Sequence, residues 1–101
     1  MLDAGEVDVA SVFTSEGQLA GDDYVVLDDP RRLFASGHVA PVVNEKVLEA
    51  HGPGLREAIN AVSRELTTSA MREMNGAVDL RKRQPAAVAG EFLRARGLLS
   101  R

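Results

Sequence analysis

Two histidines, and three serines of the first half, are side chains of this sequence that could do acid–base or nucleophilic chemistry. The imidazoles of His38 and His51 are not spaced from another potential ligand as zinc sites require, and the absence of cysteine removes thiolate ligands and thiol nucleophiles. Three serines lie near no candidate base, so a hydrolytic triad has no support: Ser11, Ser15 and Ser36. The sequence therefore predicts no enzyme, no metal site and no cofactor.

Nucleotide and nucleic-acid binding have one feature each in their favour. The stretch Gly52-Pro53-Gly54 precedes a helical pattern, but it lacks the Lys-Ser or Lys-Thr pair of a phosphate-binding loop. Arg81-Lys82-Arg83 is a basic cluster, yet the net charge is −3, and the bases that follow are interleaved with apolar positions. The leading interpretation has no nucleic-acid partner. A small interaction or nucleic-acid-binding domain that uses the basic region 81–101 is the alternative.

The charge of the chain is unevenly distributed. Residues 1–29 contain eight acidic side chains and no basic one, and the remainder contains seven acids and twelve bases. This division indicates solvated faces of opposite sign on one small domain, and an acidic and a basic partner surface is the alternative. At 101 residues the chain is long enough for one modest core and too short for two lobes that enclose a ligand.

The second half has the pattern of helices. Asn44 can cap a helix over residues 45–50, and Pro85 can open a last helix that stops at Gly97. Between them, apolar residues at three- and four-residue intervals predict an amphipathic helix from Leu55 to Leu66, and Thr67 or Thr68 can cap the next one. These three or four helices are expected to pack through Leu55, Ile59, Val62, Met71, Met74, Val88 and Phe92.

The first half has the pattern of strands and loops. Three short apolar runs rich in β-branched residues predict two or three strands, at residues 7–13, 24–27 and 39–43. The predicted fold class is therefore α/β. Phe13 ends the first of these runs beside the polar loop 14–17, and ligands gather at the carboxyl ends of strands in α/β domains. A role of Phe13 in the core is the alternative.

These pieces, in this order, resemble the closing section of the substrate-binding proteins of ABC importers for glycine betaine, choline or carnitine. The resemblance covers nearly the whole chain, and it lies in the order and spacing of several stretches. They are residues 5–17, 25–30 and 39–43, then Leu66-Thr67-Thr68 with Met71, then Asn75 with Val78-Asp79, and finally residues 85–98.

The resemblance implies the C-terminal part of a two-lobed, type II periplasmic-binding fold, with the ligand in the cleft between the lobes. Residues 1–29 would form the end of the second lobe and the return crossing strand, and residues 30–101 the C-terminal part of the first lobe. It also implies a permease partner and a periplasmic or otherwise extracytoplasmic location. We expect the chain to be a fragment without a signal sequence, and to form a homo-oligomer because strands without neighbours leave edges uncovered.

The resemblance further implies that a quaternary ammonium solute is held in a cage of tyrosines. A trimethylammonium group has a permanent charge and no donor hydrogen, so aromatic faces supply its attraction. Two cage positions map to Phe13, with Thr14 beside it, and to Gly37, with His38 beside it. The sequence departs from the family at both, because the family often has tyrosine at the first and Tyr-Asn at the second. The predicted ligand-binding residues are therefore Phe13, Thr14, Gly37 and His38.

Overall fold

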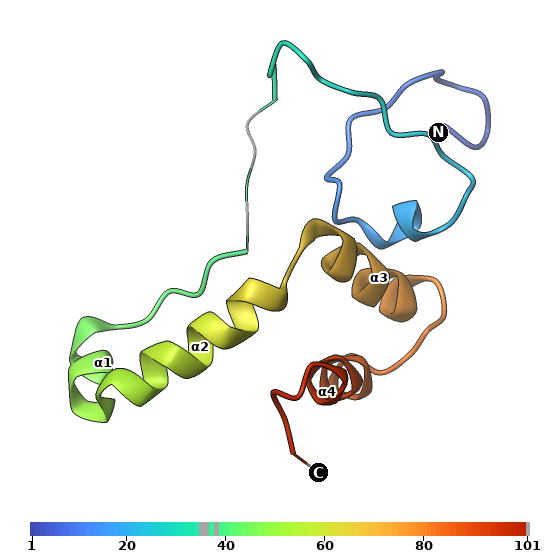
Figure 1. Ribbon diagram of the computed structural model, residues 1–101. Helices are drawn as coiled ribbons and strands as arrows, with labels where there is room; N and C mark the ends of the chain where they lie inside the picture. The colour runs from blue at the N-terminus through green and yellow to red at the C-terminus, as the bar shows by residue number, and fades with distance from the viewer. Residues whose placement is uncertain (35–36, 38, 101) are drawn as a thin grey trace.

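The computed structural model, which describes residues 1–34, 37 and 39–100, contains a short 3₁₀-helix and four α-helices (Figure 1). The 3₁₀-helix η1 spans Gly17–Ala20, and the α-helices are α1 (Glu45–His51), α2 (Pro53–Glu65), α3 (Thr68–Asp79) and α4 (Pro85–Ala95). All four α-helices lie where the periodicity and the capping residues predicted them. The contacts between elements join η1 to α3, α1 to α2, and α3 to α4.

Local signals set the ends of the first two α-helices. The Asn44 side chain accepts a hydrogen bond from the backbone N–H of Lys46 at 2.9 Å and so caps α1. Gly52 then ends α1 with a φ of 73°, a conformation that a residue without a Cβ adopts at little cost. Pro53 occupies the first turn of α2, where its missing N–H leaves no helical bond unmade.

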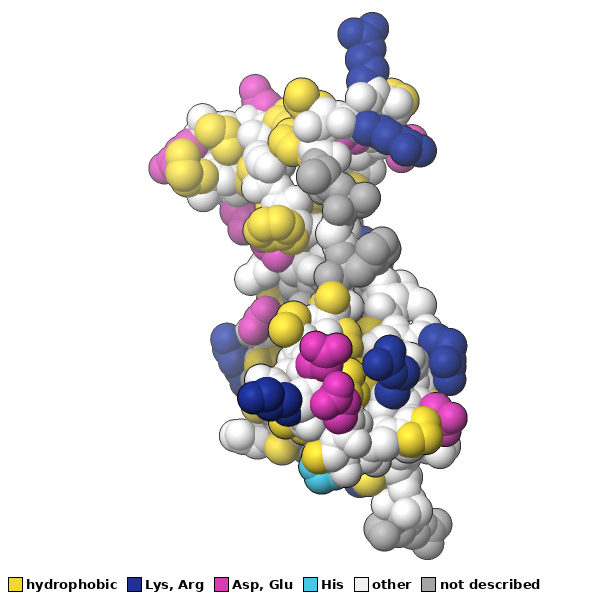
Figure 2. Space-filling model, turned by 90° about the vertical axis from the view of Figure 1, so that its left-hand side faces the viewer, with side chains coloured by type: hydrophobic (Ala, Val, Ile, Leu, Met, Phe, Trp, Pro, Cys, Tyr) yellow, Lys and Arg dark blue, Asp and Glu magenta, His cyan; other side chains and the backbone are white. Residues whose placement is uncertain are grey.

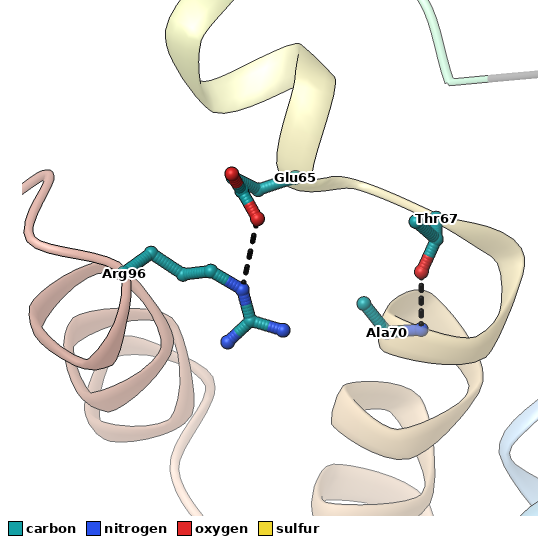
Figure 3. A network of polar contacts seen from close by, with 4 residues as sticks. All are labelled: Glu65, Thr67, Ala70 and Arg96. Carbon is teal, nitrogen blue, oxygen red and sulfur yellow. Dashed lines mark hydrogen bonds and ion pairs between the residues drawn. The ribbon is translucent and has the colours of Figure 1, made fainter.

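Figure 3 shows the cap at the start of α3 and an ion pair between the ends of α2 and α4. The Thr67 hydroxyl accepts a hydrogen bond from the Ala70 N–H at 3.0 Å and starts α3. At the end of α4, Arg96 Nε lies 3.1 Å from Glu65 Oε2 at the end of α2, and the Arg96 guanidinium also stacks over the Phe92 ring. This contact ties the ends of α2 and α4 together.

The predicted α/β class is wrong: no strand is present in the part of the chain that the structure describes. Residues 7–13, 24–27 and 39–43, which were expected to be strands, are irregular, and no backbone hydrogen bond joins one of these runs to another. β-branched composition favours a strand only where a neighbouring strand supplies the ladder bonds. These three runs have no such neighbour in the described part of the chain.

Little of the molecule is buried. Its radius of gyration is 17.2 Å, whereas a compact domain of about 100 residues has one of about 13 Å. Its accessible surface is 8438 Å², against about 5,500 Å² for a compact monomer of this mass. Among the described hydrophobic residues, Ala77 at 3% exposure and Val88 at 7% are buried. The other predicted core residues are half-buried: Leu55, Ile59, Val62, Met71, Met74 and Phe92.

Large apolar side chains remain on the surface of the first half. Figure 2 shows hydrophobic side chains on the upper part of the molecule, which corresponds to the N-terminal segment in Figure 1. Those exposed between residues 9 and 42 are Val9, Val12, Phe13, Val25, Val26, Leu27, Leu33, Phe34, Val39 and Val42. The N-terminal half thus leaves exposed the side chains that its sequence marks as core formers.

A side-chain hydrogen bond joins the two ends of residues 3–24. The Tyr24 hydroxyl donates to Asp3 Oδ1, and this bond raises the pKa of the phenol above its ordinary value. Partial burial and the negative charges of Asp3 and Asp23 act in the same direction. The neutral phenol donates this bond. The Tyr24 hydroxyl therefore keeps its proton for the bond at a pH below the ordinary pKa of tyrosine, and the bond is lost as the pH rises through the raised pKa of Tyr24.

We therefore expect the single tyrosine of the chain to titrate at a higher pH than a free tyrosine side chain. Ultraviolet absorbance of tyrosinate measures this directly, since no tryptophan interferes. An Asp3→Asn substitution removes the charged acceptor and should lower the pKa of Tyr24 toward its ordinary value. Asp8→Asn, an exposed carboxylate of the same segment, is the matched control. Identical titration of wild type and Asp3→Asn would contradict the bond.

Candidate functional site

Phe13 projects from a tight turn, which we define as the Phe13 turn, residues 13–16. The Glu16 N–H donates to the Phe13 carbonyl oxygen at 3.0 Å, and the Phe13 N–H donates to Glu16 Oε1 at 3.2 Å. The Phe13 residue is 79% exposed. Its backbone is therefore bonded on both sides while its ring is open to solvent, which contradicts the alternative that Phe13 is a core residue of this chain.

Two side chains of α3 donate hydrogen bonds to the backbone of the Phe13 turn. Arg72 Nε donates to the Thr14 carbonyl oxygen at 2.6 Å, and Asn75 Nδ2 donates to the Ser15 carbonyl oxygen at 2.7 Å. Both bonds join residues that are about sixty positions apart in sequence. The turn that carries Phe13 is thus anchored to a helix of the second half.

A close contact between glycines adds to this anchor. A Cβ on Gly17 would lie 2.6 Å from backbone atoms of Asn75 and 2.7 Å from the Gly76 nitrogen. A Cβ on Gly76 would lie 2.7 Å from the Ala20 Cβ. Gly17 and Gly76 are both buried, so η1 lies directly on the backbone of α3, as Figure 1 also shows. Side chains at these positions would force the two elements apart.

Two of the other three predicted site residues, Thr14 and Gly37, lie in the described part of the chain. Thr14 is exposed, and its carbonyl group, not its hydroxyl, makes the recorded contact. Gly37 is exposed, and a Cβ placed on it would meet nothing within 4 Å, so the Phe13 ring does not reach the place where a side chain at this position would begin. His38 lies outside the described residues. Among the described residues, the structure thus shows one exposed aromatic ring and the contacts that support its backbone.

The basic cluster that favoured nucleic-acid binding is partly neutralised. Arg81 forms an ion pair with Glu73 at 3.3 Å, and Arg83 forms one with Glu91. The hydrogen bond and charge of Arg83 lower the pKa of the Glu91 carboxyl, so this carboxylate remains ionised. Two of the three bases of this cluster are thus paired with flanking glutamates.

Neither a metal site nor a membrane-spanning helix emerges from the described part of the chain. No three acidic or histidine side chains converge there as potential metal ligands. None of its helices has the length and apolar character needed to cross a bilayer.

Sequence reasoning missed Arg72 and Asn75 as parts of this site. Asn75 belongs to a stretch that carries the family resemblance, but no role was assigned to it. The available signal was the spacing: polar residues at i and i+3 share one helix face, and Gly76, which has no side chain, lies on the same side of the helix, away from the apolar face of Met71 and Met74.

Most of the chain matches one known protein family. Residues 1–95 match the family described as the substrate binding domain of ABC-type glycine betaine transport systems. The chain belongs to this family. No solved structure matches the chain.

The names of three relatives of this chain refer to three different solutes. The chain is 31% identical over 86 residues to a glycine-betaine-binding protein of Pseudomonas aeruginosa, a match that covers 85% of the chain and 27% of the relative. It is 26% identical over 92 residues to the carnitine transport binding protein OpuCC of Listeria monocytogenes, covering 91% and 30%. It is 23% identical over 97 residues to the ergothioneine transport permease/ergothioneine binding protein EgtU of Helicobacter pylori, covering 96% and 17%. The chain thus spans less than a third of the length of these relatives.

Proposed function

We propose that the chain forms part of the solute-binding component of an ABC importer for quaternary ammonium osmoprotectants such as glycine betaine, choline or carnitine. Membership of the family supports a role in solute binding for an ABC importer. The exposed ring of Phe13 is the observation that supports a quaternary ammonium solute. The backbone of Phe13 is fixed on α3 while its ring is exposed. A rigidly placed aromatic face attracts a trimethylammonium group, which offers no hydrogen to donate.

The proposal includes the place of the chain in a larger binding protein. Residues 1–29 belong to the end of one lobe and residues 30–101 to part of the other, with an ABC permease as partner and an extracytoplasmic location. The role is binding without catalysis. The large exposed surface and the short coverage of the relatives support a place in a larger binding protein.

One aromatic wall is too little for binding by the chain alone. An exposed cation–π contact contributes about 0.5 to 1 kcal/mol, whereas association costs about 4 kcal/mol or more. We therefore expect calorimetry with glycine betaine, choline and carnitine to give no saturable signal for the 101-residue chain at micromolar concentrations. Saturable micromolar binding by the chain alone would contradict the proposal that it supplies a single wall.

A second experiment tests for binding when a relative supplies the rest of the binding protein. In a chimera, this chain replaces the matching segment of the Pseudomonas aeruginosa glycine-betaine-binding protein, and the unmodified relative is the control. The proposed function predicts that the chimera binds glycine betaine. A chimera that unfolds cooperatively on heating but shows no binding, while the relative binds, would reject the proposed function.

For the 101-residue chain on its own we propose a homodimer or higher oligomer held mainly by the N-terminal half. Val25 at 85% exposure and Val42 at 96% lie in irregular segments whose apolar side chains lack cover within the described chain. Pairing with a second copy removes such surface from water. Light scattering after size exclusion measures the mass, and a stable monomer at micromolar concentration would contradict the proposal.

A further inference from the structure

The two carbonyl groups that follow Phe13 depend on side chains of α3. The recorded backbone hydrogen bonds of this region are accepted by the carbonyls of Phe13 and Glu16. The intervening carbonyls, of Thr14 and Ser15, accept instead from Arg72 Nε and Asn75 Nδ2. The direction of the chain immediately after Phe13 is therefore set by a helix from the other half of the sequence.

Three contacts from one helix restrict the movement of this segment. Arg72 and Asn75 lie three residues apart, so both side chains leave the same face of α3. One position beyond Asn75, Gly76 brings the helix backbone against Gly17 at a distance that excludes a Cβ. The helix thus contacts residues 14, 15 and 17, which leaves the Phe13 turn little freedom to rotate.

We infer that Asn75 and Arg72 are positioning residues, which set the direction of the Phe13 ring and through it the affinity for the quaternary ammonium solute. This inference rests on the proposed function. A cation is attracted when it lies over the ring face within about 6 Å of the centroid. Rotation of the backbone at residues 13–15 would therefore weaken binding even though the ring itself is kept. The Asn75 bond is partly buried and the Arg72 bond is exposed, so Asn75 contributes more.

The first experiment measures the order of the turn without any ligand. Asn75→Asp keeps the size of the side chain and replaces the donor with a carboxylate that repels the Ser15 carbonyl. In ¹⁵N relaxation of the 101-residue chain, we expect order parameters at residues 14–17 to fall from about 0.85 toward about 0.6. Values in α2 and α4 should remain unchanged. Asn60→Asp, an exposed asparagine on α2, is the matched control.

Equal order parameters at residues 14–17 in wild type and Asn75→Asp would overturn the inference. If circular dichroism shows that Asn75→Asp has lost its helices, Arg72→Met provides the second variant, because it keeps the length of the side chain and removes the donor to Thr14. It should raise the mobility of the turn by a smaller amount, and an unchanged turn in this variant would likewise overturn the role of Arg72.

A double-mutant cycle in the chimera separates positioning from general stability. Asn75→Asp should weaken glycine betaine binding roughly three- to tenfold when Phe13 is present. In a Phe13→Leu background the same change should cost about twofold or less, because there is no ring left to position. Equal losses in both backgrounds would overturn the inference. A chimera that binds no solute, while Asn75→Asp still loosens the turn of the chain, would reject the proposed function and leave the anchoring by α3 standing.

Discussion

Gly17→Ala is expected to detach η1 from α3. The new Cβ would lie 2.6 Å from the Asn75 carbonyl carbon and oxygen, and a helix backbone cannot move aside as a flexible side chain can. Overpacking of this kind costs about 1 to 3 kcal/mol. Because the described contacts of η1 are with α3, the cost falls on the docking of the N-terminal half. The four α-helices should persist in circular dichroism.

Nuclear magnetic resonance can follow this detachment residue by residue. Nuclear Overhauser effects between residues 17–20 and α3 should disappear, and the Leu19 amide, which donates to the Glu16 carbonyl, should exchange faster. Gly54→Ala is the matched control, since a Cβ there meets nothing within 4 Å. Gly76→Ala should cost less than Gly17→Ala, because alanine improves helix propensity by about 1 kcal/mol. Unchanged contacts in Gly17→Ala would show that the two elements are not in direct backbone contact.

Phe13→Leu is expected to give a large loss of solute affinity in the chimera. Leucine keeps much of the apolar volume and removes the aromatic face. A cation–π contact is worth about 0.5 to 1 kcal/mol when exposed and about 2 kcal/mol when desolvated. Closure of a binding site around the solute excludes water, so we expect a weakening of roughly tenfold or more, measured by calorimetry.

Two further variants make this test specific. Phe13→Tyr keeps the aromatic face and should bind within about twofold of the unsubstituted chimera. Phe34→Leu changes another exposed phenylalanine, 63% exposed, that the proposal leaves outside the site, and it should have no effect. Equal affinity for Phe13→Leu and the unsubstituted chimera would remove Phe13 from the ligand wall.

The second half of this fold could be predicted from the sequence because its signals are local. Asn44, Thr67 and Pro85 start helices through hydrogen bonds or dihedral preferences that involve neighbouring residues. The three- and four-residue spacing of apolar residues between Leu55 and Leu66 requires no knowledge of any other element. The helix positions followed from these features, and the order of the stretches was enough to predict the family that the match over residues 1–95 confirms.

The prediction of strands was wrong because a strand depends on a neighbouring strand and is not a local structure. Residues 7–13 and 39–43 have strand composition, but a ladder needs a partner at about 5 Å, and none of the described residues supplies one. The burial of the predicted core residues was overestimated for the same reason, because burial also depends on neighbouring elements. Residues such as Ile59 and Met74 have the right spacing, yet they stay half-buried because the chain lacks the mass to cover them.

The sequence by itself therefore determined the helices, the family and Phe13 as the aromatic candidate. Only the tertiary structure decided that Phe13 stands on a turn fixed by Arg72 and Asn75, and that Gly17 rests on the backbone at Gly76. Propensity and periodicity describe what a residue prefers beside its chain neighbours. They carry no information about contacts across sixty residues, where the absence of a side chain and the reach of one amide group set the position of the candidate site.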